Sequence, residues 1–210
     1  MWQHWLPILV IAFAGYYLGN INGAVCVSAL LQDDVRKHGS GNAGLTNFVR
    51  NYGWGYAALV VIIDVSKAVL ACLLGKLMLE PYGYSMEGTM VGAVAVSLGH
   101  DFPAFLGFRG GKGILSGCII AFVIDWRVGL LVLGVFAVLY LLTRYVSLGS
   151  VVASATFAVG FAVFRHDRPV VMLCGIAMGL LAVYMHRGNI LRLLQGNERK
   201  TDLFKKGSKK

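Results

Sequence analysis

Long apolar stretches alternate with short polar intervals along this chain, and the alternation predicts membrane helices. The apolar segments occupy residues 6–31, 54–79, 87–99, 114–124, 128–142, 150–164 and 169–186. A helix of about 20 apolar residues spans the hydrocarbon core of a bilayer, and the first two segments are long enough. We therefore expect an all-α, polytopic membrane helix bundle with about seven transmembrane helices. A bundle of five is the alternative, in which 114–142 and 150–186 each form one paired unit.

The composition agrees with a membrane protein. Of the 210 residues, 57% are hydrophobic and 14% are charged, whereas soluble domains carry about 25% charged residues. The long apolar stretches also exclude a disordered chain. Because no basic residue precedes the first stretch and similar stretches follow it, we interpret that stretch as a membrane helix and not as a secretory signal.

The distribution of positive charge predicts the orientation in the membrane. With the N-terminus outside, the intervals 32–53, 100–113, 143–149 and 187–210 share one face. That face holds fourteen Lys and Arg residues, against three on the other face. By the positive-inside rule it faces the cytoplasm, together with the C-terminus. The five-helix alternative keeps the same orientation.

The net charge of +9 is concentrated near the end of the chain, where eight Lys and Arg residues follow residue 186. A basic tail beside a membrane segment contacts anionic lipid, so we expect membrane lipid as a partner and no nucleic acid. No repeat and no low-complexity linker divides the sequence. We expect a single transmembrane domain at 1–198 and a basic cytoplasmic tail at 199–210.

The first polar interval, GSGNAGLTNFVR at residues 39–50, has the composition of an anion site. Its glycines free the backbone N–H groups to turn toward a ligand, and its Ser, Asn and Thr side chains add short donors. Arg50 adds a planar fork suited to phosphate. A plain connecting loop is the alternative for one such string. A second glycine string favours the anion site.

That second string is GHDFPAFLGFRGGKG at residues 99–113. Arg109 and Lys112 flank two glycines just before an apolar helix, whose N-terminus favours a phosphate. A Walker A loop would need Gly in place of Leu106 and Ser or Thr in place of Gly113, so nucleotide hydrolysis is not expected.

The third string, HRGNILRLLQGNE at residues 186–198, combines an apolar helix face with polar residues. Ile190, Leu193 and Leu194 share one face, which predicts an amphipathic helix at the membrane surface. His186 and Asn189 are three residues apart, a spacing that lets both side chains point to one place.

Two ionisable residues, Asp64 and Lys67, lie inside the second apolar segment at i, i+3 spacing. Charged groups in a membrane helix are costly, so we expect the two to pair with each other or to face a polar cavity.

Other chemistries lack support in the sequence. There is no HExxH motif and no cluster of His, Cys and carboxylate residues at ligand spacing, so we expect no metal and no other cofactor. There is no GxSxG motif, and the four cysteines are far apart, which argues against a covalent serine or cysteine mechanism.

In this order and on one predicted face, the three strings resemble the three motifs of the bacterial acyl-phosphate:glycerol-3-phosphate acyltransferase family. The pair at residues 64 and 67 and the stretch 145–148 are similar to that family too, and the resemblance covers essentially the whole chain. It implies transfer of a fatty acyl group from acyl phosphate to the sn-1 hydroxyl of glycerol 3-phosphate, which yields lysophosphatidic acid and phosphate. This is the first acylation in phospholipid synthesis. The implied location is the bacterial cytoplasmic (inner) membrane, with the active site facing the cytoplasm.

The resemblance also implies the site residues. The catalytic group is Lys112, His100, Ser40, Arg50, Asn189 and His186. The substrate-binding group is Ser40, Gly41, Asn42, Gly44, Thr46, Asn47, Arg50, Asp64, Lys67, Gly110, Gly111, Lys112, Gly113, Ser147, His186 and Asn189. Glu198 is expected to hold the third motif in place without doing chemistry.

The implied reaction does not require a covalent enzyme intermediate, because phosphate is a good leaving group. Positioning of the two substrates and neutralisation of their phosphates are sufficient. A substrate phosphate oxygen is our first choice as proton acceptor, since no His–carboxylate pair is visible in the sequence, and His100 and His186 are the alternatives. The competing function is a transporter for a phosphorylated or anionic solute, but the sequence has neither inverted repeats nor polar groups on both faces.

Overall fold

The computed structural model describes residues 5–201, and this part of the chain is helical without any strand. Each of the seven predicted apolar segments forms helix. The α-helices are α1 (Trp5–Asn20), α2 (Gly23–Leu30), α3 (Leu45–Tyr52), α4 (Ala57–Leu79), α5 (Ser85–Asp101), α6 (Ile114–Ile124), α7 (Trp126–Thr143), α8 (Val146–Phe164), α9 (Pro169–Met185) and α10 (Arg187–Leu194). Short 3-10 turns at Val35–Lys37, Glu80–Tyr82 and Ala104–Leu106 complete the described elements.

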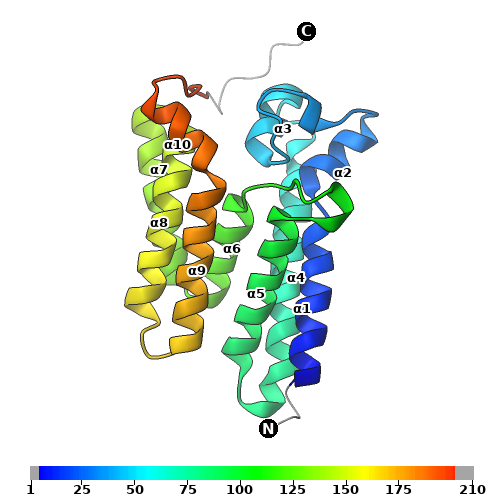
Figure 1. Cartoon of the computed structure of the whole chain (residues 1–210), viewed down its shortest axis with the longest axis vertical. Helices are drawn as coiled ribbons and strands as arrows, with labels where there is room; N and C mark the ends of the chain where they lie inside the picture. The colour runs from blue at the N-terminus through cyan, green and yellow to red at the C-terminus, as the bar shows by residue number, and fades with distance from the viewer. Residues whose placement is uncertain (1–4, 202–210) are drawn as a thin grey trace.

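The long helices form two groups that lie side by side (Figure 1). Helices α1, α4 and α5 pack together in one group, and α7, α8 and α9 in the other. Helix α6 lies between the groups and contacts α4 and α7, while α5 also contacts α9. The two groups therefore meet along one interface, and α6 occupies part of that interface.

Helix lengths give four to six candidate spans. The helices α4, α5, α7 and α8 are each long and apolar enough to cross a membrane. Two bent pairs qualify when each counts as one span: α1 with α2, at 41°, and α9 with α10, at 53°. Helix α6 has 11 residues, about 16 Å of helix, against a hydrocarbon core of about 30 Å. A seventh span therefore stays a prediction.

The paired units of the five-helix alternative form in part. Helices α6 and α7 meet at Asp125, whose carboxylate caps α7 by accepting the backbone N–H of Arg127 at 2.9 Å. Helices α8 and α9, by contrast, are separate helices that pack against each other, and α8 qualifies as a span alone.

Glycines set the close packing of α4 against α5. A Cβ atom built on Gly75 would overlap the carbonyl oxygen of Gly88, and one built on Gly92 would overlap that of Ala71. Small residues at these positions let the two backbones approach, as is common between membrane helices.

The main apolar core joins the two groups. It contains Met90 and Val96 of α5, Ile120 of α6, and Phe157 and Phe161 of α8, all buried. A smaller buried cluster around Phe48 and Val60 attaches α3 to α4.

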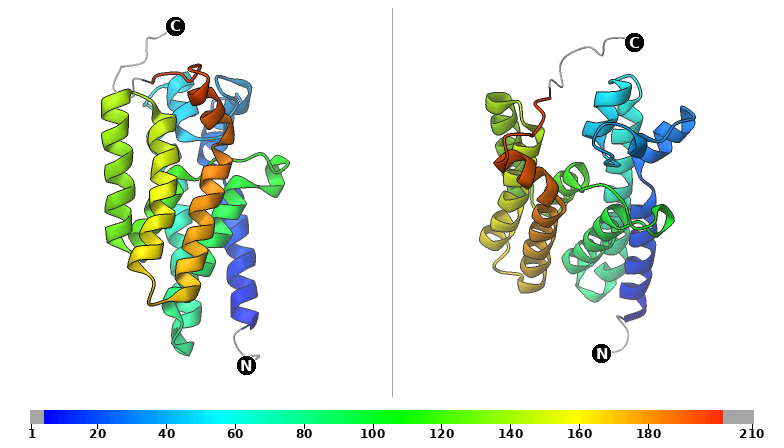
Figure 2. Two further views of the ribbon diagram at one scale, coloured as in Figure 1. Left: turned by 60° about the vertical axis from the view of Figure 1, so that its left-hand side comes forward. Right: turned by 45° about the horizontal axis from the view of Figure 1, so that its top comes forward.

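The polar segments gather at one end of the bundle, at the end opposite to the start of α1 (Figures 1 and 2). Helices α2, α3 and α10, the turn between α7 and α8, and the loop that leads into α6 all lie there. The predicted intervals therefore share one end, as expected. The side of the membrane that this end faces stays a prediction.

Candidate active site

A chain of polar side chains links the second and third glycine strings at the polar end. The Lys112 ammonium donates to Oδ1 of Asn189. Asn189 donates through Nδ2 to the Ser147 hydroxyl at 2.6 Å, and Ser147 donates to Oε1 of Glu198 at 2.7 Å. Arg192 reaches the other oxygen of Glu198 at 2.8 Å. Residues that are up to 86 positions apart are thus joined by one network.

Within this network, Glu198 ties elements together. Its side chain is 4% exposed, and its two oxygens are occupied by Ser147 from α8 and Arg192 from α10. This arrangement fits the expected supporting role of Glu198.

A second cluster lies deeper, where α4 and α5 pass the break between α1 and α2. The Lys67 ammonium lies 2.8 Å from Oδ1 of Asp64 and 2.8 Å from Nδ1 of His100. It also donates to the carbonyl oxygens of Gly19 and Ile21, at 3.3 Å and 2.7 Å. The expected pairing of Asp64 with Lys67 is confirmed. The pair also satisfies backbone groups that the break in the helix leaves open.

These contacts assign the protons on His100. An ammonium group has only donors, so Nδ1 of His100 accepts from Lys67, and Nε2 of the neutral ring carries the proton. His100 is therefore a hydrogen-bond donor on the side that faces the glycine loop.

The glycine loop meets His100 at Gly111. The Gly111 N–H donates to the His100 carbonyl oxygen at 3.0 Å, and a Cβ built on Gly111 would overlap Nε2 of the His100 ring. The same Cβ would lie 3.0 Å from the carbonyl oxygen of Ala43. Gly111 is the point where the first and second strings come together, and a larger residue does not fit there.

Asn47 occupies the centre of the first string. Its Nδ2 donates to the carbonyl oxygens of Val35, His38 and Asn42, and its Oδ1 accepts the Ser40 N–H at 3.0 Å. The side chain is 2% exposed. The amide of Asn47 thus holds the loop together in this structure, and the expected substrate contact at Asn47 stays a prediction.

The rest of the first string is more open. Gly41 has a positive φ of 69°, and the side chain of the adjacent Ser40 is exposed. Helix α3 begins after Gly44 without a side-chain cap, with Thr46 in its first turn. Its N-terminal N–H groups are thus available to an anion.

Arg50, at the other end of α3, contacts a residue that the sequence did not single out. Its Nε donates to the Thr201 hydroxyl at 2.9 Å. Thr201 is buried, and its N–H donates to the Arg144 carbonyl oxygen at 2.9 Å. Its own carbonyl oxygen accepts from Tyr140. The packed chain thus extends past the expected domain boundary at Glu198. Residues 202–210 of the expected tail lie outside the described residues.

The electrostatic state of Lys112 is set by its surroundings. Its pKa is lowered to about 8, first because burial removes water from the ammonium and second because Arg192 is a nearby like charge. Glu198 acts in the opposite direction. An anion bound beside Lys112 would favour its charged form.

His186 lies on the same side. Its Nδ1 donates to the Ala182 carbonyl oxygen at 2.8 Å, which leaves the lone pair on Nε2. The Asn189 N–H donates to the His186 carbonyl oxygen at 2.8 Å, so the two third-string residues are one turn apart, and the convergence of their side chains stays a prediction.

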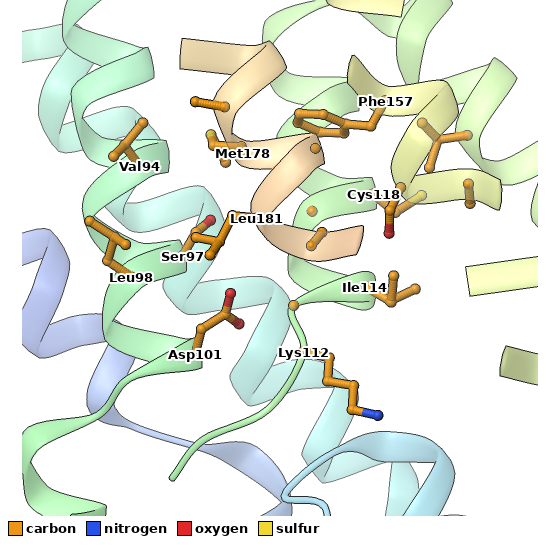
Figure 3. A pocket seen from close by; sticks show the side chains of 18 of the residues that line it. Val94, Ser97, Leu98, Asp101, Lys112, Ile114, Cys118, Phe157, Met178 and Leu181 are labelled. Atoms are coloured by element: carbon orange, nitrogen blue, oxygen red, sulfur yellow. The ribbon is translucent and has the colours of Figure 1, made fainter. Parts of the chain in front are cut away.

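An apolar cavity of about 210 Å³ adjoins these polar groups (Figure 3). Helices α5, α6, α8 and α9 line it, and its walls include Val94, Phe157 and Met178. Lys112 and Asp101 lie at one end of the cavity. The site therefore combines anion-binding groups at the mouth with an apolar chamber, an arrangement that fits a ligand with a charged head and an apolar tail.

Fold and site together define an integral membrane protein with a cationic, glycine-rich site at one end of a helix bundle. Comparison with known proteins narrows this class. A family model described as "Glycerol-3-phosphate acyltransferase" matches residues 9–196. The chain belongs to this family and is an acyltransferase, so the alternative of a transporter is set aside.

Curated relatives bear the same name. The glycerol-3-phosphate acyltransferase of Thermoanaerobacter sp. (strain X514) is 39% identical over 190 residues, which cover 90% of this chain and 93% of the relative. That of Anaeromyxobacter dehalogenans (strain 2CP-C) is 40% identical over 194 residues, which cover 91% and 96%.

The fold is also found in solved structures. A crystal structure of PlsY (YgiH), described as an integral membrane glycerol 3-phosphate acyltransferase in its glycerol 3-phosphate form, is similar with a TM-score of 0.82 and 31% identity. The match covers 94% of this chain and 99% of that one. The lysophosphatidic acid form of PlsY is similar with a TM-score of 0.78, over 93% and 96% of the two chains.

Proposed function

We propose that the protein transfers a fatty acyl group from acyl phosphate to the sn-1 hydroxyl of glycerol 3-phosphate, giving lysophosphatidic acid and phosphate. The observation that carries this proposal is the Lys112–Asn189–Ser147 network at the mouth of an apolar cavity. The solved PlsY structures, described as glycerol 3-phosphate and lysophosphatidic acid forms, support the acceptor and the product.

The donor fits the cavity end of the site. An acyl chain in the chamber would bring the acyl phosphate head to Lys112 and to the N-terminus of α6, which begins after Gly113 without a side-chain cap. Backbone N–H groups and one ammonium would neutralise its phosphate.

The acceptor fits the first string. The open N-terminus of α3, with Ser40 and Thr46, offers hydrogen-bond donors to the phosphate of glycerol 3-phosphate, and Arg50 in the last turn of α3 would add one positive charge. Contact between the two strings at Gly111 would bring the two substrates close together.

The protein supplies position and charge in this reaction. Since phosphate leaves readily, holding the hydroxyl against the carbonyl carbon and neutralising two phosphates accounts for catalysis without a covalent intermediate. His100 would serve as a donor through Nε2, and Lys67 would hold its ring.

We place the site on the cytoplasmic side of a bacterial cytoplasmic (inner) membrane. The described intervals at the polar end carry most of the loop Lys and Arg residues of the described chain, an excess that marks cytoplasmic loops. Acyl phosphate and glycerol 3-phosphate would both reach the site from there.

The test is a reconstituted reaction. Purified protein in lipid nanodiscs is mixed with palmitoyl phosphate and glycerol 3-phosphate, and released phosphate and lysophosphatidic acid are measured. Equal amounts of both products are expected, and palmitoyl-CoA in place of palmitoyl phosphate is expected to give neither. Acylation from palmitoyl-CoA but not from palmitoyl phosphate would overturn the proposed donor.

A further inference from the structure

Two buried amide side chains at the break between α1 and α2 have no assigned role. Asn20 ends α1 and Asn22 precedes α2, and they are 4% and 1% exposed. Neither residue lies in one of the three strings. Buried polar groups normally have hydrogen-bond partners, so the partners of these two amides show what the amides hold.

Asn22 holds the first string. Its Nδ2 donates to the carbonyl oxygen of Ala43 at 2.9 Å, and its Oδ1 accepts the Val25 N–H at 3.0 Å, which caps α2. Ala43 is also the residue that Gly111 approaches, because a Cβ built on Gly111 would lie 3.0 Å from the Ala43 carbonyl oxygen. The same oxygen therefore accepts from Asn22 and adjoins the second string.

Asn20 holds the second string. Its Oδ1 accepts the Phe105 N–H at 3.1 Å, and its Nδ2 donates at 2.8 Å to the Tyr16 carbonyl oxygen, one turn earlier in α1. The Tyr16 hydroxyl donates to the Phe102 carbonyl oxygen of the same string at 2.8 Å. The loop of the second string is thus attached to the end of α1.

The break between the two amides is fixed to α4. Lys67 donates to the Ile21 carbonyl oxygen at 2.7 Å, and the Asp64 carboxylate accepts the Gly23 N–H at 3.2 Å. A Cβ built on Gly23 would lie 2.7 Å from the carbonyl oxygen of Val60, so α2 begins in close contact with α4. Two amides, two positions apart, therefore extend from one fixed segment to two different loops.

We propose that Asn22 and Asn20 are positioning residues, which set the place of the first string relative to the second and so the distance between the two bound substrates. This inference rests on the proposed function, in which the two strings hold the two substrates. The internal shape of the first string does not depend on Asn22, since the Asn47 side chain holds that loop through its own hydrogen bonds. Loss of the Asn22 contact therefore displaces an intact loop, which lowers the rate of transfer more than the binding of either substrate.

The test is a steady-state comparison, in lipid nanodiscs, with the variant Asn22→Ser. Serine caps helices as asparagine does, so α2 keeps its N-cap, but the serine side chain is one bond shorter and does not reach the Ala43 carbonyl oxygen. We expect kcat to fall by about 10- to 100-fold and KM for each substrate to stay within about threefold, because a displacement of about 1 Å reduces catalysis by up to about 100-fold. Asn22→Thr is measured in parallel, in case Asn22→Ser is unstable.

Asn20→Ala tests the second contact. It removes the acceptor of the Phe105 N–H, and the same fall in kcat without a rise in KM is expected. Thr89→Val is the matched control for loss of a buried hydrogen bond, because the Thr89 hydroxyl donates only within α5, to the Ser85 carbonyl oxygen at 2.8 Å. Its kcat is expected to equal that of wild type.

A double-mutant cycle gives a readout that general destabilisation would not move. Gly111→Ala already shifts the loop at the Ala43 contact, so Asn22→Ser added to it is expected to lower kcat/KM by less than about twofold more, whereas independent effects multiply.

The outcomes separate the two proposals. Wild-type kcat in Asn22→Ser, a loss carried by KM alone, or full multiplication of the two effects in the cycle would each overturn the role of Asn22. Either of the first two results for Asn20→Ala would overturn that of Asn20. All variants are measured with the donor that the wild-type protein uses, palmitoyl phosphate or palmitoyl-CoA. Failure of the proposed donor is therefore seen in the wild type and leaves the comparison of variants valid.

Discussion

Lys112 lies where the polar network meets the apolar cavity, and its chemistry follows from that position. Its neighbours at the network end are uncharged or cationic, apart from Glu198, and burial removes water from its ammonium. Because burial has already removed part of the water from this ammonium, binding of an anionic head group costs less further desolvation.

Replacing Lys112 with Ala should lower kcat/KM by about 100- to 1,000-fold, the effect of removing one group that stabilises charge in the transition state. Release of phosphate from palmitoyl phosphate measures it. Lys76→Ala is the control, because Lys76 lies exposed in the last turn of α4. Near-normal transfer by Lys112→Ala would remove Lys112 from the site.

The lowered pKa of Lys112 also predicts a pH dependence. Its charged form is complete well below pH 8 and is lost as the pH rises through about 8. If the charge is needed, kcat/KM falls on the alkaline side with an apparent pKa near 8. Lys112→Arg, whose guanidinium stays charged, should move this alkaline limb to higher pH. A limb that does not move would assign the titration to another group.

At the scale of elements, the shape of the glycine loop that leads into α6 is set by close contacts and less by backbone flexibility. Gly111 lies between the His100 ring and the Ala43 carbonyl, and Asn47 holds the facing loop in shape. Both strings look alike in sequence. In three dimensions Asn47 of the first string holds its own loop together, whereas Gly111 of the second string is the point where the two loops touch.

Gly111→Ala tests that contact. Because the added methyl group overlaps the His100 ring, the loop must shift, and we expect at least a 100-fold loss of kcat/KM, since small displacements of this size reduce catalysis strongly. Gly134→Ala in α7, where a Cβ meets open space, is the control. Wild-type activity in Gly111→Ala would show that the loop tolerates the shift.

For the whole molecule, the site is built from both helix groups. His100 comes from α5 of the first group and Arg50 from α3, which packs on α4, whereas Ser147 comes from α8 of the second group and Asn189 from α10, which packs on α8 and α9. Thr201 bridges the two groups, through Arg50 of α3 on one side and the end of α7 on the other. The chain end therefore contributes to the relative position of the two halves.

Truncation at two points should separate lipid binding from this bridge. Deletion of 202–210 removes four lysines and should weaken the preference for anionic nanodiscs while transfer continues. Deletion of 199–210 also removes Thr201 and should raise KM for glycerol 3-phosphate several-fold, because Arg50 loses its partner. Equal KM values for the two truncated proteins would show that Thr201 does not position Arg50.

The sequence by itself determined the features that depend on local composition. Apolar length predicted each of the seven helical segments, and the cost of charge in lipid predicted the Asp64–Lys67 pair. The three strings predicted which polar residues lie together in the candidate site. The preference of a side chain for water or lipid and the conformational freedom of glycine are properties of single residues and their near neighbours. The order of residues along the chain is therefore enough to predict them.

Tertiary structure decided what depends on neighbours that are distant in the chain. It determined that the Asn47 amide holds its own loop, that Thr201 is buried, and that Oδ1 of Asp101 is buried beside an apolar cavity with no hydrogen-bond partner among residues 5–201. In the sequence, Thr201 is one residue of a basic tail and Asp101 is one residue at a helix end. Nothing in the composition around them distinguishes either one. Their surroundings arise because α5 meets the start of α6 and because Thr201 contacts α3 and the end of α7, and only packing brings those groups together.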